Sequence, residues 1–483
     1  MLGLIGIFVA LGLLMWLAYS GRSVLISAPI AAVVAAAFSG EPLLAHWTLT
    51  YMGAAAGFIA QWFPMFLLGA LFGKLMEDSG SITSIAQYLT DRLGTRRTML
   101  SVVLISALVT YGGVSVFVVF FVLVPMARQM FRAADIPGRL LPATVGLGAC
   151  TFTLSAIPGT PSINNSVPIP YFGTTTFAAP GLGIIAAAVI LAVGMWWLHR
   201  AEAKARRAGE GYGRAAEPGA PVISKAVRER AASAREFDLA ELSASERNPQ
   251  GPRFTLAIMP LLAVIVTNLL MSLVIFPASD YSFLAEPRWG ETSIGAVSGA
   301  WSVVIALGVA NLTVLAINGR TLPSLRESLD AGANAAALPM MMIASLVGFG
   351  AVVVTLPAFS MVRDAVFAFP GGPLVQLAVA VNVLAGLTGT AAGGVAIVLN
   401  AFGEDFMRLA TEHGIDPQVM HRITTISAGT LDTLPHNGTI LLLLQLSGMS
   451  HRESYFDLIM TVIVSCIAGL VAVVALASVF GSF

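Results

Sequence analysis

The sequence predicts an all-α polytopic membrane protein built from two inverted repeats. The composition, a polar segment in mid-chain and a set of landmarks that occurs twice support this class. Of the 483 residues, 57% are hydrophobic and 11% are charged, whereas soluble proteins have about 25% charged residues. A helix that spans a bilayer needs roughly 20 mostly apolar residues, and many such runs occur between 2–19 and 457–479. The chain therefore belongs in a lipid bilayer.

The polar segment, residues 199–253, divides the chain into two membrane halves. It mixes many Lys and Arg residues with acids, proline and glycine, which is typical of a solvated linker. We expect a first repeat at 1–198 and a second at 254–483. Loops rich in Lys and Arg remain on the cytoplasmic side of a membrane, so the linker is predicted to be cytoplasmic.

Four landmarks occur in the same order in both halves, which indicates a duplication. They are an early helix with a proline (Pro64, Pro339), a glycine pair (Gly112–Gly113, Gly393–Gly394), a polar stretch with a proline (Pro137, Pro417) and an apolar segment that polar residues interrupt (155–161, 432–439). A single Gly or Pro match would be weak, because both residues are frequent in membrane helices. Four matches at similar spacing predict a repeat.

The orientation of the helices follows from a cytoplasmic linker. The glycine pairs are predicted at the tips of two re-entrant hairpins, 98–126 with its tip at 111–115 and 372–402 with its tip at 387–394. About ten transmembrane helices accompany these hairpins, and the two halves then have opposite topology. All Lys and Arg residues face the cytoplasm in this arrangement except Arg288, Arg363, Arg408 and Arg422, in agreement with the positive-inside rule.

The two hairpin tips and the two broken crossings are predicted to form one site. Irregular backbone is tolerated at membrane depth only where it is buried in protein or lines a cavity. Each break exposes the N-terminus of a following half-helix, which favours an anion. The candidate substrate-binding residues are Gly112, Gly113, Ser115, Ser155, Thr160, Ser162, Asn164, Asn165, Thr388, Gly389, Thr390, His436, Asn437, Gly438 and Thr439. For any single polar residue, simple helix packing is the alternative.

The charges near the breaks restrict the substrate. No Lys or Arg occurs within the four breaks, so two or three negative charges would be poorly compensated in a low-dielectric cavity, and a monocarboxylate is favoured. A protonated His436 would weaken this argument. Asp432 is the only acid inside the paired core segments, and apolar surroundings favour the neutral form of a carboxyl group, so it is the candidate proton-coupling residue. A local cap near Pro435 is the alternative for Asp432.

Three runs resemble the gluconate:proton symporter (GntP) family. They are GALFGKLMEDSG (69–80), IPGTPSINN (157–165) and LDTLPHNG (431–438). The Leu-Pro-His-Asn-Gly form is similar to the hydroxybutyrate permease branch and departs from the His-Val-Asn-Asp run of gluconate carriers. The resemblance implies membership of the ion transporter superfamily, a homodimer and elevator-type movement. It also implies scaffold helices at about 1–75 and 254–353, and transport segments with a hairpin and broken helix at about 98–170 and 371–446.

The predicted function is therefore proton-coupled symport of a small organic monocarboxylate, 3-hydroxybutyrate or a gluconate-like sugar acid, across the bacterial inner membrane. Sodium coupling is the main alternative, because Ser115, Thr388 and Thr390 offer oxygen ligands. The sequence contains no His-Glu-x-x-His motif or Gly-x-Ser-x-Gly elbow, so an enzyme is not expected. An anion channel is a further alternative, and single-channel current instead of saturable uptake would reveal it. No metal, cofactor or nucleic-acid partner is expected; the partners are the anion, the proton or sodium ion, and the lipid bilayer.

Overall fold

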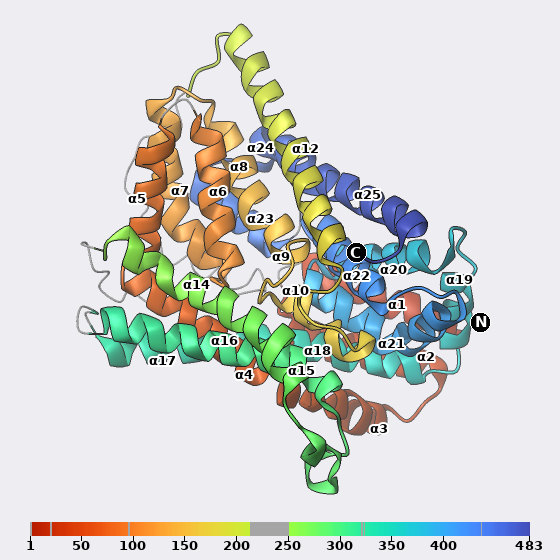
Figure 1. Ribbon diagram of the computed structural model, residues 1–483. Coiled ribbons are helices and arrows are strands. Elements are labelled where there is room, and N and C mark those ends of the chain that lie inside the picture. The colour runs from red at the N-terminus through yellow and green to blue at the C-terminus, as the bar shows by residue number, and fades with distance from the viewer. Residues whose placement is uncertain are drawn as a thin grey trace.

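The protein is helical throughout the part of the chain that the structure describes. The computed structural model describes residues 2–19, 22–94, 97–212, 251–319, 322, 324–435 and 437–483. Within these ranges it has helices and no strand (Figure 1). The predicted all-α class is confirmed.

The first half contains α1 (Leu2–Tyr19), α2 (Val24–Ser39), α3 (Leu43–Ala45), η1 (His46–Tyr51), α4 (Met52–Asp78), α5 (Ser81–Leu93), α6 (Thr98–Tyr111), α7 (Val116–Ala133), η3 (Gly138–Leu140), α8 (Leu141–Ala149), α9 (Phe152–Ser155), α10 (Ile163–Ser166), α11 (Ile169–Phe172) and α12 (Pro180–Arg207). The second half contains α14 (Phe254–Leu270), η5 (Met271–Ile275), α15 (Phe276–Ala278), η6 (Ser282–Ala285), η7 (Pro287–Trp289), α16 (Ile294–Asn318), α17 (Leu325–Ala335), α18 (Ala337–Thr355), α19 (Phe359–Phe367), α20 (Gly372–Thr388), α21 (Ala391–Glu412), α22 (Pro417–Leu431), α23 (Gly438–Ser447), α24 (His451–Leu458), η8 (Ile459–Val464) and α25 (Ser465–Phe480).

The described residues include seven helices that are long and apolar enough to cross a membrane. They are Leu43–Asp78, Val116–Ala133, Pro180–Arg207, Phe254–Ala278, Ile294–Asn318, Leu325–Thr355 and His451–Phe480. The apolar helices Leu2–Leu17, Val24–Ser39, Thr98–Tyr111, Gly372–Thr388 and Gly438–Ser447 are shorter. One of the seven, Val116–Ala133, is an arm of the first predicted hairpin, so six of them correspond to predicted crossings. The short helices α1 and α2 and the two interrupted crossings account for the other four of the ten predicted. The protein is a multi-pass membrane protein.

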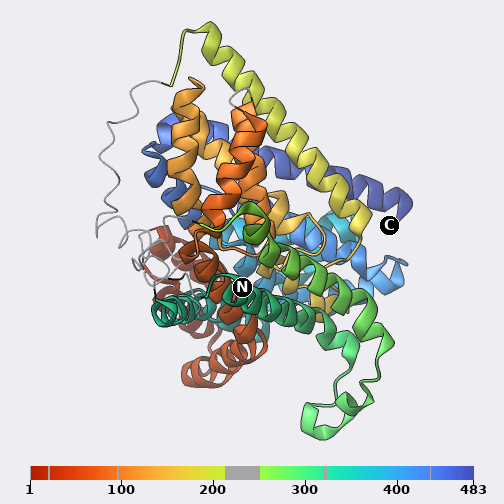
Figure 2. The ribbon, with the colours of Figure 1, turned by 60° about the vertical axis from the view of Figure 1, so that its left-hand side comes forward.

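Two groups of helices pack against each other. The first helix group consists of α1, α2, α4, α14, α16, α17 and α18, and the second helix group consists of α6–α9 and α20–α23. The two groups meet where α18 packs against α21 and where α4 packs against α7. The long helices α12 and α25, which end the two halves, lie side by side along the outside (Figures 1 and 2).

Both predicted hairpins are present in the second helix group. Helix α6 turns into α7 at 112–115, and α20 turns into α21 at Gly389–Thr390. Gly113 has φ +93° and Gly389 has φ +68°, a region that glycine enters without a steric cost. The second turn lies within the predicted tip at 387–394, but the prediction that the Gly393–Gly394 pair forms this turn is wrong, because both glycines lie inside α21. A Cβ atom at Gly394 would come within 2.5 Å of the Ala385 backbone, so this glycine permits close packing of α20 on α21.

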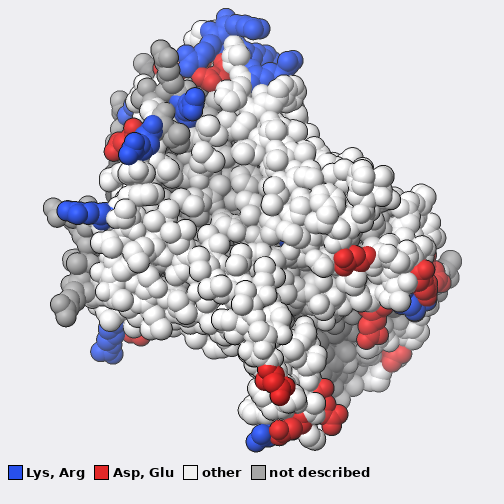
Figure 3. All heavy atoms as spheres, viewed as in Figure 1, with Lys and Arg blue, Asp and Glu red and all other residues white. Residues whose placement is uncertain are grey.

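Charged residues are separated between the ends of the molecule. Figure 3 shows Lys and Arg gathered at the top, where α12 ends, and acids gathered at the bottom. Exposed Arg200, Lys204, Arg206 and Arg207 occupy the end of α12, and exposed Asp280, Glu286 and Glu291 lie in and beside the loop between α15 and α16. Helix α12 continues to Arg207, beyond the predicted linker start at residue 199, and residues 213–250 of that linker lie outside the described residues.

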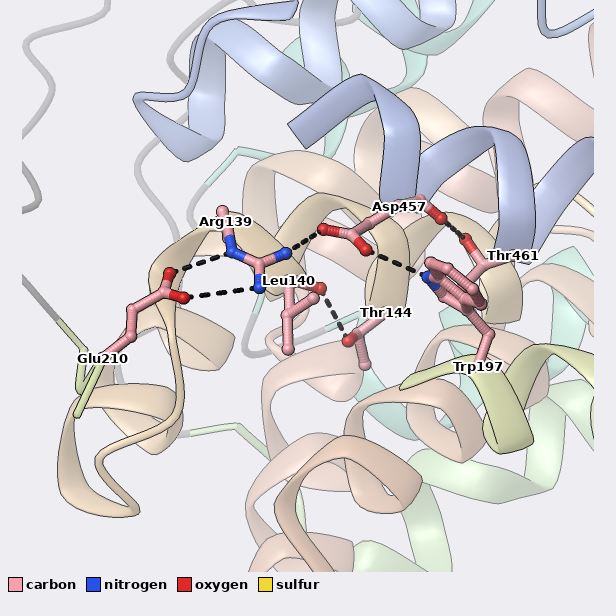
Figure 4. Close-up of polar contacts among 7 residues, drawn as sticks. All are labelled: Arg139, Leu140, Thr144, Trp197, Glu210, Asp457 and Thr461. Atoms are coloured by element: carbon pink, nitrogen blue, oxygen red, sulfur yellow. Dashed lines mark hydrogen bonds and ion pairs between the residues drawn. The ribbon is translucent and has the colours of Figure 1, made fainter. Parts of the chain in front are cut away.

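A polar cluster joins both halves near the end of α12 (Figure 4). The Asp457 carboxylate in α24 accepts a hydrogen bond from Trp197 Nε1 of α12 at 2.9 Å and pairs with the guanidinium of Arg139 in η3. Arg139 Nε also donates to Glu210 at 2.9 Å. Burial lowers the pKa of Arg139, but Glu210 and Asp457 raise it by more, so the net shift is upward. The cluster therefore fixes α24 against η3 and α12.

Candidate functional site

One cavity of about 300 Å³ lies where both hairpins and both broken crossings meet. Its wall contains eleven of the predicted site residues: Gly113, Ser115, Ser162, Asn164, Thr388, Gly389, Thr390, Asp432, Asn437, Gly438 and Thr439. Apolar side chains of the first helix group, such as Met65, Met342 and Leu307, form much of the rest. The cavity therefore combines residues from the two halves and from the two helix groups. His436 lies outside the described residues.

The tip of the first hairpin packs directly on the first broken crossing. A Cβ atom at Gly113 would lie 3.0 Å from Pro161 Cγ, and Tyr111 Oη donates to the carbonyl oxygen of Pro158 at 2.9 Å. The polar side of this break is occupied by Ser162, whose hydroxyl donates to Leu154 O at 2.6 Å. The position of the tip is thus fixed by the break.

The tip of the second hairpin is held by one side chain of the second broken crossing. Asn437 Nδ2 donates to the carbonyl oxygens of Gly389 at 2.9 Å and Asp432 at 2.7 Å. Its Oδ1 accepts the N–H of Ile440 at 3.1 Å and so caps α23. Both N–H donors of the amide and one of the two acceptor positions of Oδ1 are therefore occupied within the protein. Asn437 shapes the cavity, and the start of α23 faces it.

Three polar side chains of the wall have no hydrogen bond in the described part of the protein. They are Ser115, Asn164 and Thr390, and each is half-buried at the cavity. Thr388 differs from them, because its hydroxyl already donates to Leu384 O at 2.8 Å. Ser115, Asn164 and Thr390 come from the first hairpin, the first break and the second hairpin, so they can bind a polar ligand from three directions.

Four predicted residues lie behind the wall instead of in it. Gly112 faces α14, since a Cβ atom there would meet Leu261 at 2.1 Å. Ser155, Thr160 and Asn165 are fully buried. The half-helix that was expected after the first break is also reduced to the single turn of α10, four residues long, because the chain turns again before Pro168. Only the second break leads into a longer half-helix, the ten-residue α23.

Arg422 is a site residue that the sequence analysis missed, because it was expected on the outer side of the membrane, away from the site. It lies in α22, is fully buried, and points into the first break. Its guanidinium donates to five acceptors, the carbonyl oxygens of Ala178, Ser155, Ala156 and Thr176 and the side chain of Asn165. The expectation that no basic residue lies at the breaks is therefore wrong. One pattern in the sequence could have identified Arg422: it stands next to His421 among apolar residues of a core helix. An ionisable residue within a membrane segment is by default a functional candidate.

His421 and Asn165 complete this buried network. His421 Nδ1 lies 2.6 Å from Thr174 Oγ1, and Nε2 lies 3.2 Å from Asn165 Oδ1. Asn165 Nδ2 donates to the carbonyl oxygens of Thr160 and Thr176 at 3.0 and 2.9 Å. The irregular chain between α9 and α12 is thereby held in one conformation although it has little regular structure.

Asp432 lies at the opposite end of α22, where it follows the last helical residue and lines the cavity. The matching residue of the first half, Ser155, is buried against Gly429 of α22. A Cβ atom added to Gly429 would lie 3.3 Å from the hydroxyl oxygen of Ser155. The two breaks therefore differ in chemistry. Only the second one offers a carboxyl group to the cavity.

A cavity with polar residues between interrupted helices, in a multi-pass membrane protein, is the arrangement of a membrane transporter. A model of the GntP family permeases matches residues 2–208. The chain is also 38% identical to the uncharacterized transporter YxjC of Bacillus subtilis strain 168 over 484 residues, which covers 99% of each chain. The chain belongs to the GntP permease family, and is not an enzyme.

Two solved transporter structures have a similar fold. MtrF of Neisseria gonorrhoeae, which represents a class of antimetabolite efflux pumps, matches with a TM-score of 0.54 and 15% identity over 91% of this chain and 86% of that one. The YdaH transporter of Alcanivorax borkumensis, which has an unusual topology, matches with a TM-score of 0.52 and 14% identity over 90% and 88%. At these identities the likeness concerns the fold alone.

Proposed function

We infer that this permease carries a small organic monocarboxylate together with a proton. The convergence of both hairpins and both breaks on one cavity carries this proposal. The cavity volume of about 300 Å³ is at the lower end of small-molecule sites, which suits 3-hydroxybutyrate or a short sugar acid. Ser115, Asn164 and Thr390 supply partners for a carboxylate and a hydroxyl. Asp432 supplies a group that can take up and release a proton.

The same proposal includes inverted repeats and elevator-type movement. Each half has a hairpin, then an interrupted crossing, then a long terminal helix, in the same order. Both hairpins and both breaks belong to the second helix group or adjoin it, which supports a transport domain that moves as a unit. The first helix group would be the scaffold. Its exposed apolar residues, such as Leu262, Val266 and Leu312, suit contact with lipid or with the second subunit of a homodimer.

We place the linker in the cytoplasm of a bacterial inner-membrane protein. The basic end of α12 supports this orientation, because Arg and Lys are enriched in cytoplasmic loops. The acidic loop between α15 and α16 would then face outward (Figure 3).

Uptake into proteoliposomes tests the function. The purified full chain would be assayed with labelled 3-hydroxybutyrate, gluconate, citrate and succinate, under an inward proton gradient and separately under an inward sodium gradient. We expect saturable, proton-driven uptake of a monocarboxylate. Preference for citrate or succinate would contradict the proposed substrate class. Uptake driven only by sodium would show that the coupled ion is sodium, bound at the hairpin tips, and not a proton. Single-channel current would contradict the transporter mechanism.

A further inference from the structure

Arg422 is a buried positive charge whose hydrogen-bond acceptors are all uncharged. Four of the acceptors are backbone carbonyl oxygens and the fifth is the Asn165 amide. Within the part of the chain that the structure describes, no ion pair links Arg422 to Asp or Glu. Removing a charge from water without an opposite charge costs several kcal/mol. The carbonyl oxygens hold the guanidinium in place, but they do not neutralise it.

This charge lies directly behind one wall of the cavity. Arg422 Nη1 donates to Ser155 O at 3.3 Å and to Ala156 O at 3.2 Å. Leu154, which directly precedes these two residues, and Pro161, five residues after Ala156, line the cavity. Arg422 itself does not line the cavity, and its donors are occupied, so it acts on a ligand through its electric field. In a water-poor interior such a field is weakly screened.

Asp432 and Arg422 belong to the same structural element. Asp432 follows the last residue of α22, ten positions after Arg422, and a helix rises about 1.5 Å per residue, so the two backbones are about 15 Å apart. The cavity thus has a fixed cation behind the wall of the first break and a carboxyl group in the wall of the second break.

We propose that Arg422 is the fixed positive charge of the substrate site and restricts it to ligands with one negative charge. This inference rests on the proposed function. In the empty site the ionised Asp432 carboxylate balances Arg422. In the loaded site the carboxylate of the substrate balances Arg422, and Asp432 holds the co-transported proton. These three groups sum to zero in both states, whereas a dicarboxylate would leave one excess negative charge. Arg422 is therefore a specificity-determining residue that does not contact the substrate.

Binding to the purified full chain tests this role. Titration calorimetry would compare 3-hydroxybutyrate with 1,3-butanediol, in which an uncharged hydroxymethyl group replaces the carboxylate. The variants are Arg422→Gln, which removes the charge, and Arg422→Lys, which keeps the charge but loses the planar fork. Arg408→Gln is the matched control, because Arg408 lies in α21 with a side chain that is 57% exposed. Thermal unfolding would show that each variant is folded.

We expect Arg422→Gln to weaken binding of 3-hydroxybutyrate on the order of tenfold or more, about 1.4 kcal/mol per factor of ten. Binding of 1,3-butanediol should stay equally weak, so the preference for the anion falls. Arg422→Lys should keep part of that preference, and Arg408→Gln should equal the wild type. A purely structural residue would instead affect both ligands equally. In uptake assays the KM for 3-hydroxybutyrate should rise more than the maximal rate per folded protein falls.

Two results would overturn this inference. One is a folded Arg422→Gln protein that binds 3-hydroxybutyrate with wild-type affinity. The other is loss of folding in both Arg422 variants, which would assign the residue to structure alone. Failure of the proposed function can be distinguished from failure of this inference, because in the first case the wild-type protein itself would take up no monocarboxylate of the panel.

Discussion

Asn268 of α14 donates a hydrogen bond to the carbonyl oxygen of Gly159 at 3.0 Å, so the first broken crossing is attached to a helix of the opposite half. The same amide donates to Thr176 Oγ1 at 3.1 Å, and Ser272 donates to its Oδ1 at 3.3 Å. This is a contact between the first helix group and the irregular chain that supports the cavity. Elevator-type movement would have to break it.

A disulfide across this contact should therefore stop transport. Asn268→Cys combined with Thr176→Cys places two thiols where the native side chains are 3.1 Å apart, in a background without Cys150 and Cys466. We expect oxidation to abolish uptake and reduction to restore it. The control joins positions 68 and 311, where Asn311 Nδ2 donates to the backbone carbonyl oxygen of Leu68 at 3.0 Å and connects α16 to α4 within the first helix group. Uptake that survives a complete Asn268–Thr176 crosslink would contradict elevator movement at this boundary.

Two asparagines of the cavity should respond differently to the same substitution. Asn437→Ala removes the cap of α23 and the bonds to Gly389 and Asp432, so we expect a loss of stability of about 1–3 kcal/mol. Asn164→Ala removes a side chain that has no hydrogen bond in the described residues, so thermal stability should stay within about 0.5 kcal/mol. The KM of Asn164→Ala should nevertheless rise severalfold. Equal unfolding temperatures for the two variants would refute this division of roles.

The cluster at Asp457 predicts a stability effect remote from the cavity. The Asp457 side chain is 4% exposed, and its removal leaves Trp197 Nε1 without its acceptor, so Asp457→Ala should cost about 1–3 kcal/mol. Glu210→Gln is the control, because Glu210 is 41% exposed and exposed ion pairs contribute at most about 1 kcal/mol. Chemical or thermal unfolding in detergent measures both. If Glu210→Gln lowered the free energy of unfolding more than Asp457→Ala, the buried Asp457 contacts would not be the main source of stability in this cluster.

The sequence was sufficient to predict the class, the hairpins and most of the cavity wall, because each depends on a local pattern. Apolar runs predict spanning helices, and Pro and Gly inside such runs predict breaks that must be buried in protein. The positions of Gly113, Asp432 and Asn437 followed from that reasoning. The turn of the second hairpin lies within the predicted tip, but the Gly393–Gly394 pair was wrongly assigned to that turn. Gly389 and Gly394 are both compatible with a turn, and only the packing on Ala385 decides between them.

The role of Arg422 depends on tertiary structure and could not be read from spacing. It is ten residues from the second break along the chain, yet it serves the first break, more than 250 residues away. Similarly, Ser155 and Asn165 are next to cavity residues in sequence but point away from the cavity. The local sequence pattern identified the breaks. It could not show which side chains point into the cavity, because that depends on how α22 packs against the first break.

The last prediction concerns proton coupling by Asp432. Asp432→Asn keeps the size of the side chain and removes its titration, so the co-transported proton has no acceptor there. A carboxyl group that is protonated as the anion arrives lowers the charge that must cross the apolar barrier. We therefore expect this variant to lose accumulation driven by a pH gradient in proteoliposomes while it retains binding and exchange of 3-hydroxybutyrate. If Asp432 is only a cap of the break, binding, exchange and thermal stability should fall together. A stable Asp432→Asn protein that still concentrates substrate at the wild-type rate would exclude Asp432 as the coupling group, and the proton would have to be sought at His436 or replaced by sodium.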